Sequence, residues 1–283
     1  SAGLTDPADK ARAAFDLAIV SVLLDAGAGM GWRYRDGALG VETGRSEGLA
    51  LASFRMFEAG AFSADPAEPL RADARRLASL AEGDIAKGFQ ASETNPLVGV
   101  EGRAGLLNAL GRAVATLPGA RPGGLFDVLV GNAGRDPSPL PVDTGRGRAA
   151  VPATASRSIP APAILAAVLE HLGPIWPSRI VLDGVPLGDT WRHPLIAGDD
   201  PATAGLVPFH KLSQWLSYSL IEPLQAAGIA VADIDGLTGL PEYRNGGLFV
   251  DMRVLTLRDP ALAGLAHAVD SPLVVEWRAL TLA

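Results

Sequence analysis

The chain has 283 residues, and 48% of them are hydrophobic, so it can bury a substantial core and should not be disordered. Its net charge of −7 lacks the basic footprint of a generic nucleic-acid-binding protein, and no apolar run approaches the roughly 20 residues that cross a bilayer. The absence of cysteine excludes disulfides and thiolate metal sites, and the four histidines are not spaced as metal ligands. We therefore expect a cytoplasmic protein without a metal site and without a nucleic-acid or membrane partner.

The first half of the chain predicts a series of helices. Asp6 followed by Pro7 is typical of a helix start, and apolar residues then keep helical spacing as far as Ala26. Further helices are expected at 45–59 with Ser46 as the cap, at 70–89 with a break at Gly83, at 101–117 and at 124–130.

A glycine-rich stretch follows the first helix, from Leu23 to Gly31. It resembles the strand and glycine loop with which methyltransferases bind S-adenosylmethionine. The pattern before it is long and helical, however, and no regular alternation of strands and helices comes after it. A helix end with Gly27 in the left-handed conformation is the favoured interpretation, and the methyltransferase is kept as an alternative.

Apolar periodicity disappears between residues 131 and 162, where Gly, Pro, Ser, Thr and Arg predominate. We expect a flexible insertion there, either passive or a cationic lid that carries Arg146, Arg148 and Arg157. A helix at 163–172 and a strand-like piece at 179–187 follow, the latter with a hairpin turn at Asp183–Gly184.

Several candidate binding residues lie in the last third of the chain. Trp191, Arg192 and His193 are consecutive and suit either an anionic or planar ligand or a packed tryptophan beside two surface residues. From Phe209 to Leu220, leucines at helical spacing predict a helix that Pro223 ends or kinks. Its second face carries Lys211, Trp215, Tyr218 and Glu222.

The stretch from Asp233 to Val250 packs acids, an arginine and a tyrosine among glycines, including Asp235, Glu242, Tyr243 and Arg244. Without further information, a surface helix and a polar loop also account for this composition. The segment 250–257 fits a strand or a helix, and helices are expected at 259–268 and 272–283.

Several blocks together resemble a family of proteins linked to uracil catabolism in bacteria and fungi. The similarity covers nearly the whole chain, and full-length members have a longer N-terminal part, so the chain is expected to be a C-terminal portion. The blocks include the ranges 16–29, 44–48, 123–127, 187–194, 207–215, 237–247 and 275–281. Trp32, Arg45 and His210 lie within or next to these blocks, and the resemblance implies that they contribute to ligand binding.

A more distant similarity connects the chain to the queuosine salvage proteins, which hydrolyse the N-glycosidic bond of queuosine 5′-phosphate. Their Lys-x-x-Gln helix matches Lys211 and Gln214, and their Leu-Thr-x-Phe-Ala-Asp-Tyr-Arg block matches residues 237–244. Their Glu-x-Arg-Ala helix matches residues 276–279. Glu242 stands where that family has aspartate. Ser219 stands where it carries a second acid, which leaves the catalytic acid open.

The resemblance implies a mainly α fold like that of helical DNA glycosylases, formed as one domain over 1–283 with a small β element at 179–187. It further implies an N-glycoside hydrolase that acts on a ribosylurea or its 5′-phosphate and needs no cofactor or metal. Glu242 is the first candidate for the catalytic carboxylate, with Asp235 and Glu222 as alternatives. Lys211 and Arg244 would hold a phosphate, and Trp215, Tyr218 and Tyr243 would line the pocket. A non-catalytic binding protein of the same pathway remains the competing interpretation, and a homodimer is compatible with either.

Overall fold

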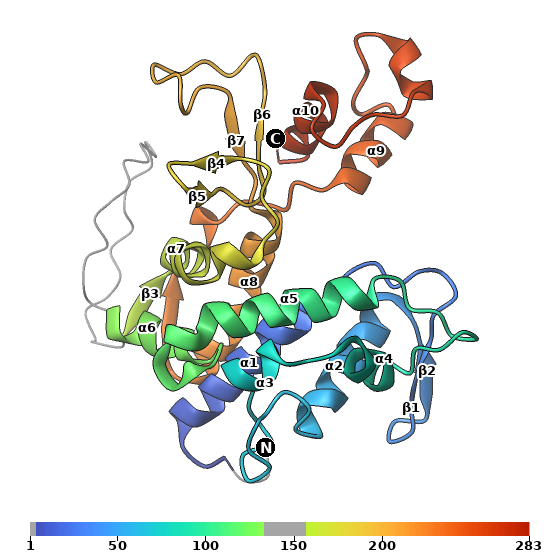
Figure 1. The fold of residues 1–283 in the computed structure, drawn as a ribbon. Helices are drawn as coiled ribbons and strands as arrows, with labels where there is room; N and C mark the ends of the chain where they lie inside the picture. The colour runs from blue at the N-terminus through green and yellow to red at the C-terminus, as the bar shows by residue number, and fades with distance from the viewer. Residues whose placement is uncertain (1–3, 133–156, 283) are drawn as a thin grey trace. The chain divides into compact units, whose positions relative to one another are not determined.

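The computed structural model describes residues 4–132 and 157–282, and these are mainly α-helical, as the sequence predicts (Figure 1). They divide into two compact units. Unit 1 comprises residues 1–175 and 216–234, and unit 2 comprises residues 176–215 and 235–283. The division falls within one helix, after Trp215. A single domain over the whole chain stays a prediction.

Unit 1 is built around α1 (Pro7–Leu24), which packs against α2 (Arg45–Glu58), α5 (Val100–Ala113) and α6 (Gly124–Asn132). The predicted start of α1 is confirmed, because the Asp6 carboxylate accepts the backbone N–H groups of Ala8 and Asp9. On the inner face of α1, Phe15 is fully buried and meets Phe126 edge to face, with ring centroids 5.7 Å apart.

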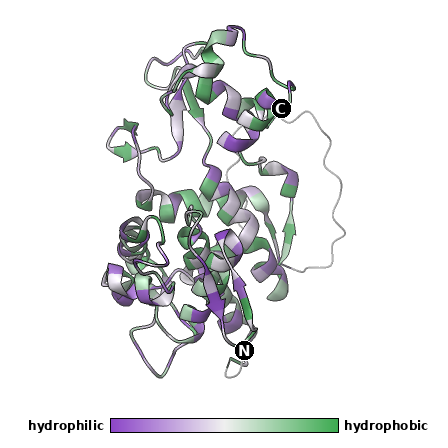
Figure 2. Ribbon diagram, turned by 90° about the vertical axis from the view of Figure 1, so that its right-hand side faces the viewer, coloured by the Kyte–Doolittle hydropathy of each residue, from purple (hydrophilic) through white to green (hydrophobic). Residues whose placement is uncertain are grey.

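The remaining elements of unit 1 surround this core. A short hairpin joins β1 (Tyr34–Asp36) to β2 (Val41–Thr43), and α3 (Ala74–Ala78) and α4 (Glu82–Gly88) pack along α5. α7 (Ala161–Leu172) lies against α6. β3 (Ser158–Pro160) pairs in parallel with β8 (Ala230–Ala232). Hydrophobic and hydrophilic residues alternate around the helices, the amphipathic pattern on which the predictions depended (Figure 2).

Unit 2 combines short strands with helices. β4 (Val181–Leu182) and β5 (Val185–Pro186) form the predicted hairpin at 179–187, in which Asp183 and Gly184 both have positive φ. β6 (Thr190–Arg192) pairs antiparallel with β7 (Leu206–Pro208), and β7 leads into the start of α8 (Lys211–Ala226). The C-terminal helices α9 (Tyr243–Asp251) and α10 (Pro272–Leu280) pack against each other.

Four expectations about helix boundaries are wrong for local reasons. Gly27 is not left-handed, since α1 ends at Leu24 and Asp25 caps it through its backbone. Ser46 is not the cap of α2, because its hydroxyl donates to Asp25 while Gly44 occupies the cap position. The break in 70–89 falls between α3 and α4, before Gly83. Of the two outcomes expected at Pro223, the helix end is wrong, because α8 continues for three more residues with fully buried Leu224 in its last turn.

Other predicted segments are shorter than expected or of another type. The helix predicted at 101–117 ends at Ala113 and is followed by a 3₁₀ turn. The segment predicted as a helix at 259–268 forms a 3₁₀ turn over Pro260–Gly264. The segment 250–257 holds only the end of α9. The expected insertion at 131–162 has regular structure at both edges, because residues 131–132 complete α6 and residues 158–160 form β3. Residues 133–156, which include Arg146 and Arg148, lie outside the described residues.

Among the described residues, the strands pair only two by two, and the glycine-rich stretch 23–31 follows a helix. A buried central strand leading into that stretch is therefore missing from the structure. The fold does not supply the frame on which a methyltransferase would bind S-adenosylmethionine through this loop.

Candidate active site

Unit 2 contains a cavity of about 290 Å³ at the start of α8. Its lining residues come from the segment after α7, from the loop before β6, from the first turn of α8 and from the C-terminal helices. They are Trp176, Pro177, Asp189, His210, Lys211, Leu212, Ser213, Tyr243 and Arg278. The cavity combines apolar surface with a few charged groups, as small-molecule sites commonly do.

Asp189 is the central acceptor of this cavity. Its two carboxylate oxygens receive Nη1 and Nη2 of Arg278 at 3.0 and 2.9 Å, a bidentate pair. The Trp191 indole donates to Oδ1 at 2.6 Å, and the backbone N–H of Lys211 donates to Oδ2 at 3.1 Å. Burial would raise the pKa of Asp189, but the hydrogen bonds from Arg278 and Trp191 outweigh it and lower that pKa. Asp189 is therefore ionised at neutral pH.

Arg278 is held among aromatic rings and is 2% exposed. Its guanidinium carbon lies 4.3 Å from the ring centroid of Phe209 and 4.5 Å from that of Tyr243. Nε donates to the Pro241 carbonyl at 3.1 Å, and Nη1 also donates to the Tyr243 hydroxyl at 3.3 Å. One buried arginine thus ties α10 to the loop before β6 and to the start of α9.

α9 and α10 approach closely at Gly246. A Cβ atom at this position would lie 2.8 Å from Cδ1 of Trp277, closer than real contacts allow. Glycine therefore permits the packing that brings the start of α9, with Glu242 as its N-cap residue, towards Arg278 on α10.

Lys211 and Glu242 form an ion pair beside the cavity. Their side chains are 22% and 18% exposed, so the pair is partly shielded from solvent. Burial would raise the pKa of Glu242, but the hydrogen bond and the charge of Lys211 outweigh it and lower that pKa. A carboxylate that stays ionised at neutral pH is thereby held next to a lining cation.

His210 joins β7 to α8 in an unusual conformation. Its φ of 47° lies in the left-handed region that few residues other than glycine adopt, and its backbone N–H donates to the Asp189 carbonyl at 3.1 Å. Burial lowers the pKa of the His210 imidazole, although the nearby Asp189 charge acts in the opposite direction. The imidazole is therefore neutral at pH 7.

Trp176 contributes a hydrogen-bond donor that has no partner. Its indole Nε1 is buried and, among the described residues, no acceptor lies within hydrogen-bonding range. An indole N–H can only donate, and a buried donor left unpaired carries a desolvation cost. Trp176 also lines the cavity, so its indole is a candidate contact for a bound molecule.

The structure brings several of the sequence-predicted residues to this cavity and places others near it. His210, Lys211 and Tyr243 line it, and Glu242 and Trp191 contact lining residues. Gln214 is buried on α8 and accepts the Thr238 backbone N–H at 3.3 Å.

The other predicted residues of unit 2 do not line the cavity. Arg192 is exposed and donates to the carbonyls of Ala202 and Ala204, while His193 is buried and its backbone N–H donates to the Gly205 carbonyl at 2.8 Å. Arg244 and Asp235 are exposed, and Trp215 is half-buried on α8.

Four predicted residues belong to unit 1. Tyr218 and Glu222 lie on the unit 1 portion of α8, half-buried and exposed respectively. Trp32 is fully buried and donates to the Phe89 carbonyl at 2.9 Å, so it packs in the core. Arg45 is exposed at the start of α2.

Asp189, Arg278 and Trp176 line the cavity but were not singled out as site residues from the sequence. Asp189 and Arg278 are 89 positions apart and meet only through the fold. The sequence observation that could have identified them is that they lie inside the blocks 187–194 and 275–281, which the family shares. Trp176 gave no signal, because an unpaired indole N–H is visible only in three dimensions.

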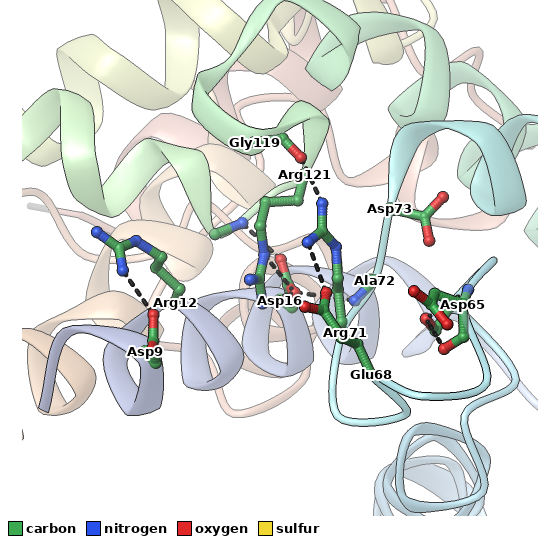
Figure 3. A network of polar contacts seen from close by, with 12 residues as sticks. Asp9, Arg12, Asp16, Asp65, Glu68, Arg71, Ala72, Asp73, Gly119 and Arg121 are labelled. Atoms are coloured by element: carbon green, nitrogen blue, oxygen red, sulfur yellow. Dashed lines mark hydrogen bonds and ion pairs between the residues drawn. The ribbon is translucent and has the colours of Figure 1, made fainter. Parts of the chain in front are cut away.

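A larger cavity, of about 960 Å³, lies in unit 1. Three arginines line it, and each is already paired (Figure 3). Arg12 contacts Asp9 and Asp127, Arg71 contacts Glu68 and the Gly119 carbonyl, and Arg121 contacts Asp16. Among the described residues, the buried unpaired donors are Trp176 and Trp277, both in unit 2. We therefore assign the candidate site to the smaller cavity.

Within residues 4–132 and 157–282, His, Asp and Glu side chains do not gather in groups of three that could hold a metal ion. In the same part of the chain, no helix has the length and hydropathy of a membrane span.

Comparison with known proteins gives a consistent result over the whole chain. The model of a family described as "Protein of unknown function (DUF1688)" matches residues 1–283. "Protein urg3" of Schizosaccharomyces pombe is 39% identical over 98% of the chain and 62% of its own length. "Uracil catabolism protein 4" of Lachancea kluyveri is 37% identical over 98% of the chain and 65% of its own length. The chain thus spans less than two-thirds of either relative.

Proposed function

The chain belongs to the DUF1688 family, and we propose that it acts in uracil catabolism as an N-glycoside hydrolase. Its substrate would be a ribosylurea or the corresponding 5′-phosphate. The name of the Lachancea kluyveri relative, "Uracil catabolism protein 4", supports the pathway. The similarity of residues 211–214, 237–244 and 276–279 to the queuosine salvage proteins supports the type of bond.

One observation carries the proposal: Lys211 and Glu242, 31 positions apart, form an ion pair at the edge of a cavity. Both residues fall in the blocks that resemble an N-glycosidase family, and the cavity beside them is lined by His210, Tyr243 and the buried indole of Trp176. A cavity of about 290 Å³ is of the size that holds a small molecule.

The proposed chemistry follows from the charge on Glu242. When the bond between the ribose C1 and the urea nitrogen breaks, positive charge develops on the sugar. The ionised Glu242 carboxylate stabilises that charge and orients the attacking water. Water supplies its oxygen to C1 and a proton to the departing nitrogen, so the products are ribose and neutral urea. Lys211 keeps Glu242 ionised, which is the condition for this role.

A non-catalytic binding protein is the second candidate function. The same ion pair favours it in one respect, because a Lys211–Glu242 pair can simply hold the loop before α9 in place. In that case the cavity binds its ligand and releases it unchanged.

The two functions differ in whether urea is released. We would incubate the full chain with N-ribosylurea and, separately, with its 5′-phosphate, and measure free urea over time. Hydrolysis predicts urea in proportion to enzyme, with ribose or ribose 5-phosphate in equal amount. Binding of either compound without urea would favour the non-catalytic protein and reject the hydrolase.

A further inference from the structure

We propose that the cavity of unit 2 takes an electrically neutral ligand, so that the preferred substrate is the unphosphorylated N-ribosyl compound. This inference rests on the proposed function for the identity of the sugar. It narrows that function to one of the two substrates, and it depends on how the charges around the cavity are already paired.

Both cations that line the cavity are neutralised by the protein itself. Lys211 is paired with Glu242, and Arg278 with Asp189. Among the described residues, Arg278 uses four of the five N–H groups of a guanidinium, on Asp189, the Pro241 carbonyl and Tyr243. A bound phosphate would therefore find no lining cation that lacks a carboxylate partner.

The amino end of α8 is the second place where an anion would be expected, because helix N-termini attract negative charge. Asp189 already occupies it, since its Oδ2 accepts the backbone N–H of Lys211 at 3.1 Å. A phosphate placed there would meet this carboxylate at close range. The helix end thus serves a protein carboxylate and is not open to a second anion.

The remaining polar groups of the cavity suit a neutral molecule. The imidazole of His210 is uncharged at pH 7, and Trp176 offers an indole N–H without a partner. Carbonyl and hydroxyl oxygens of an N-ribosyl amide are acceptors of the kind that this donor lacks. A phosphate dianion would lose its hydration in the cavity without gaining a free counter-charge.

The test is a pair of calorimetric titrations of the full chain with N-ribosylurea and with N-ribosylurea 5′-phosphate. We expect the neutral compound to bind at least about tenfold more tightly, because burying an uncompensated dianion is strongly unfavourable. We also expect its dissociation constant to change little between low and high salt, since few net charges are paired on binding. Equal or tighter binding of the phosphate would overturn the inference, and so would binding of neither compound.

Two tryptophan variants test the role of the unpaired donor. Trp176→Phe should raise the dissociation constant of N-ribosylurea by about 2- to 12-fold, the change that corresponds to the loss of one hydrogen bond between neutral groups. Trp277→Phe is the matched control, because its Nε1 is also buried without a partner but lies by a different cavity. Weakening by Trp277→Phe and not by Trp176→Phe would remove Trp176 from the site.

These outcomes separate the inference from the proposed function. Urea released faster from the phosphate would overturn the inference and leave the hydrolase standing. Tighter binding of the neutral compound without urea release would support the inference and reject the hydrolase.

Discussion

Each unit contains an arginine paired with a carboxylate, but the two pairs have different surroundings. In unit 1, Asp16 is fully buried and accepts the backbone N–H groups of Ala72 and Gly123, together with Nε and Nη2 of Arg121 (Figure 3). In unit 2, the Asp189 side chain keeps 28% exposure, and its partner Arg278 lies among aromatic rings beside a cavity.

The two carboxylates hold different kinds of group, backbone segments in one pair and cavity-lining groups in the other. Asp16 takes its bonds from loops that precede α3 and α6, so it fixes the positions of backbone segments. Asp189 holds groups that face a cavity, including the start of α8 with Lys211. We infer that the first pair contributes to stability, and that the second contributes to both stability and ligand binding.

The largest expected effect concerns Asp16. Asp16→Ala leaves Arg121 and two backbone donors without an acceptor, so the free energy of unfolding should fall by about 3–5 kcal/mol. Denaturant titration followed by circular dichroism measures it. Asp9→Ala is the control, since Asp9 belongs to an exposed pair with Arg12 and should change stability by about 0–1 kcal/mol. Equal effects of the two variants would show that the Asp16 network is not a structural centre.

A second prediction compares the two arginines directly. Arg121→Lys and Arg278→Lys keep the charge but lose the planar fork, so each should lower the free energy of unfolding by about 1.5–3 kcal/mol. Only Arg278→Lys should also weaken binding of N-ribosylurea, measured by calorimetry. If Arg121→Lys weakened binding to the same extent, the assignment of separate roles to the two pairs would fail.

The smallest expected effect is a pH dependence due to His210. Burial lowers its pKa below the ordinary value of 6.5, so as pH falls through 6.5 the unfolded chain takes up a proton before the folded chain does. The contribution of His210 to stability is therefore complete above pH 6.5 and is lost as pH falls through the folded pKa. His210→Asn, which tolerates the left-handed backbone, should reduce the loss of stability between pH 7 and pH 5. An unchanged loss would mean that this imidazole titrates normally.

Local features of the fold were predictable from the sequence. Asp6 and Pro7 mark the start of α1, and Asp183–Gly184 marks the hairpin, because caps and turns depend on a few neighbouring residues. The end of α8 was not predictable in this way. Pro223 disfavours a helix locally, but Leu220 and Leu224 on either side are fully buried, and burial outweighs one lost hydrogen bond.

The site was predictable only for residues that belong to a motif formed by consecutive positions of the sequence. Lys211, Glu242 and Tyr243 lie in two blocks whose residue types indicate chemistry, and the structure brings them together. Asp189 and Arg278 lie far apart in the chain, and no periodicity relates them. The unpaired donor of Trp176 is a property of packing, so no sequence pattern reports it.

The most direct test of the account is the rate of urea release by Glu242→Gln compared with Glu42→Gln. Glu42 also forms an ion pair with a cation, Arg35, but on a hairpin of unit 1 remote in sequence from the site residues, so it is a matched control for the same change. We predict that Glu242→Gln lowers turnover of N-ribosylurea by about 10²–10³-fold while the folded protein retains its circular dichroism spectrum, and that Glu42→Gln leaves turnover unchanged. Unchanged turnover by a folded Glu242→Gln variant would contradict the account and move the catalytic role to another carboxylate.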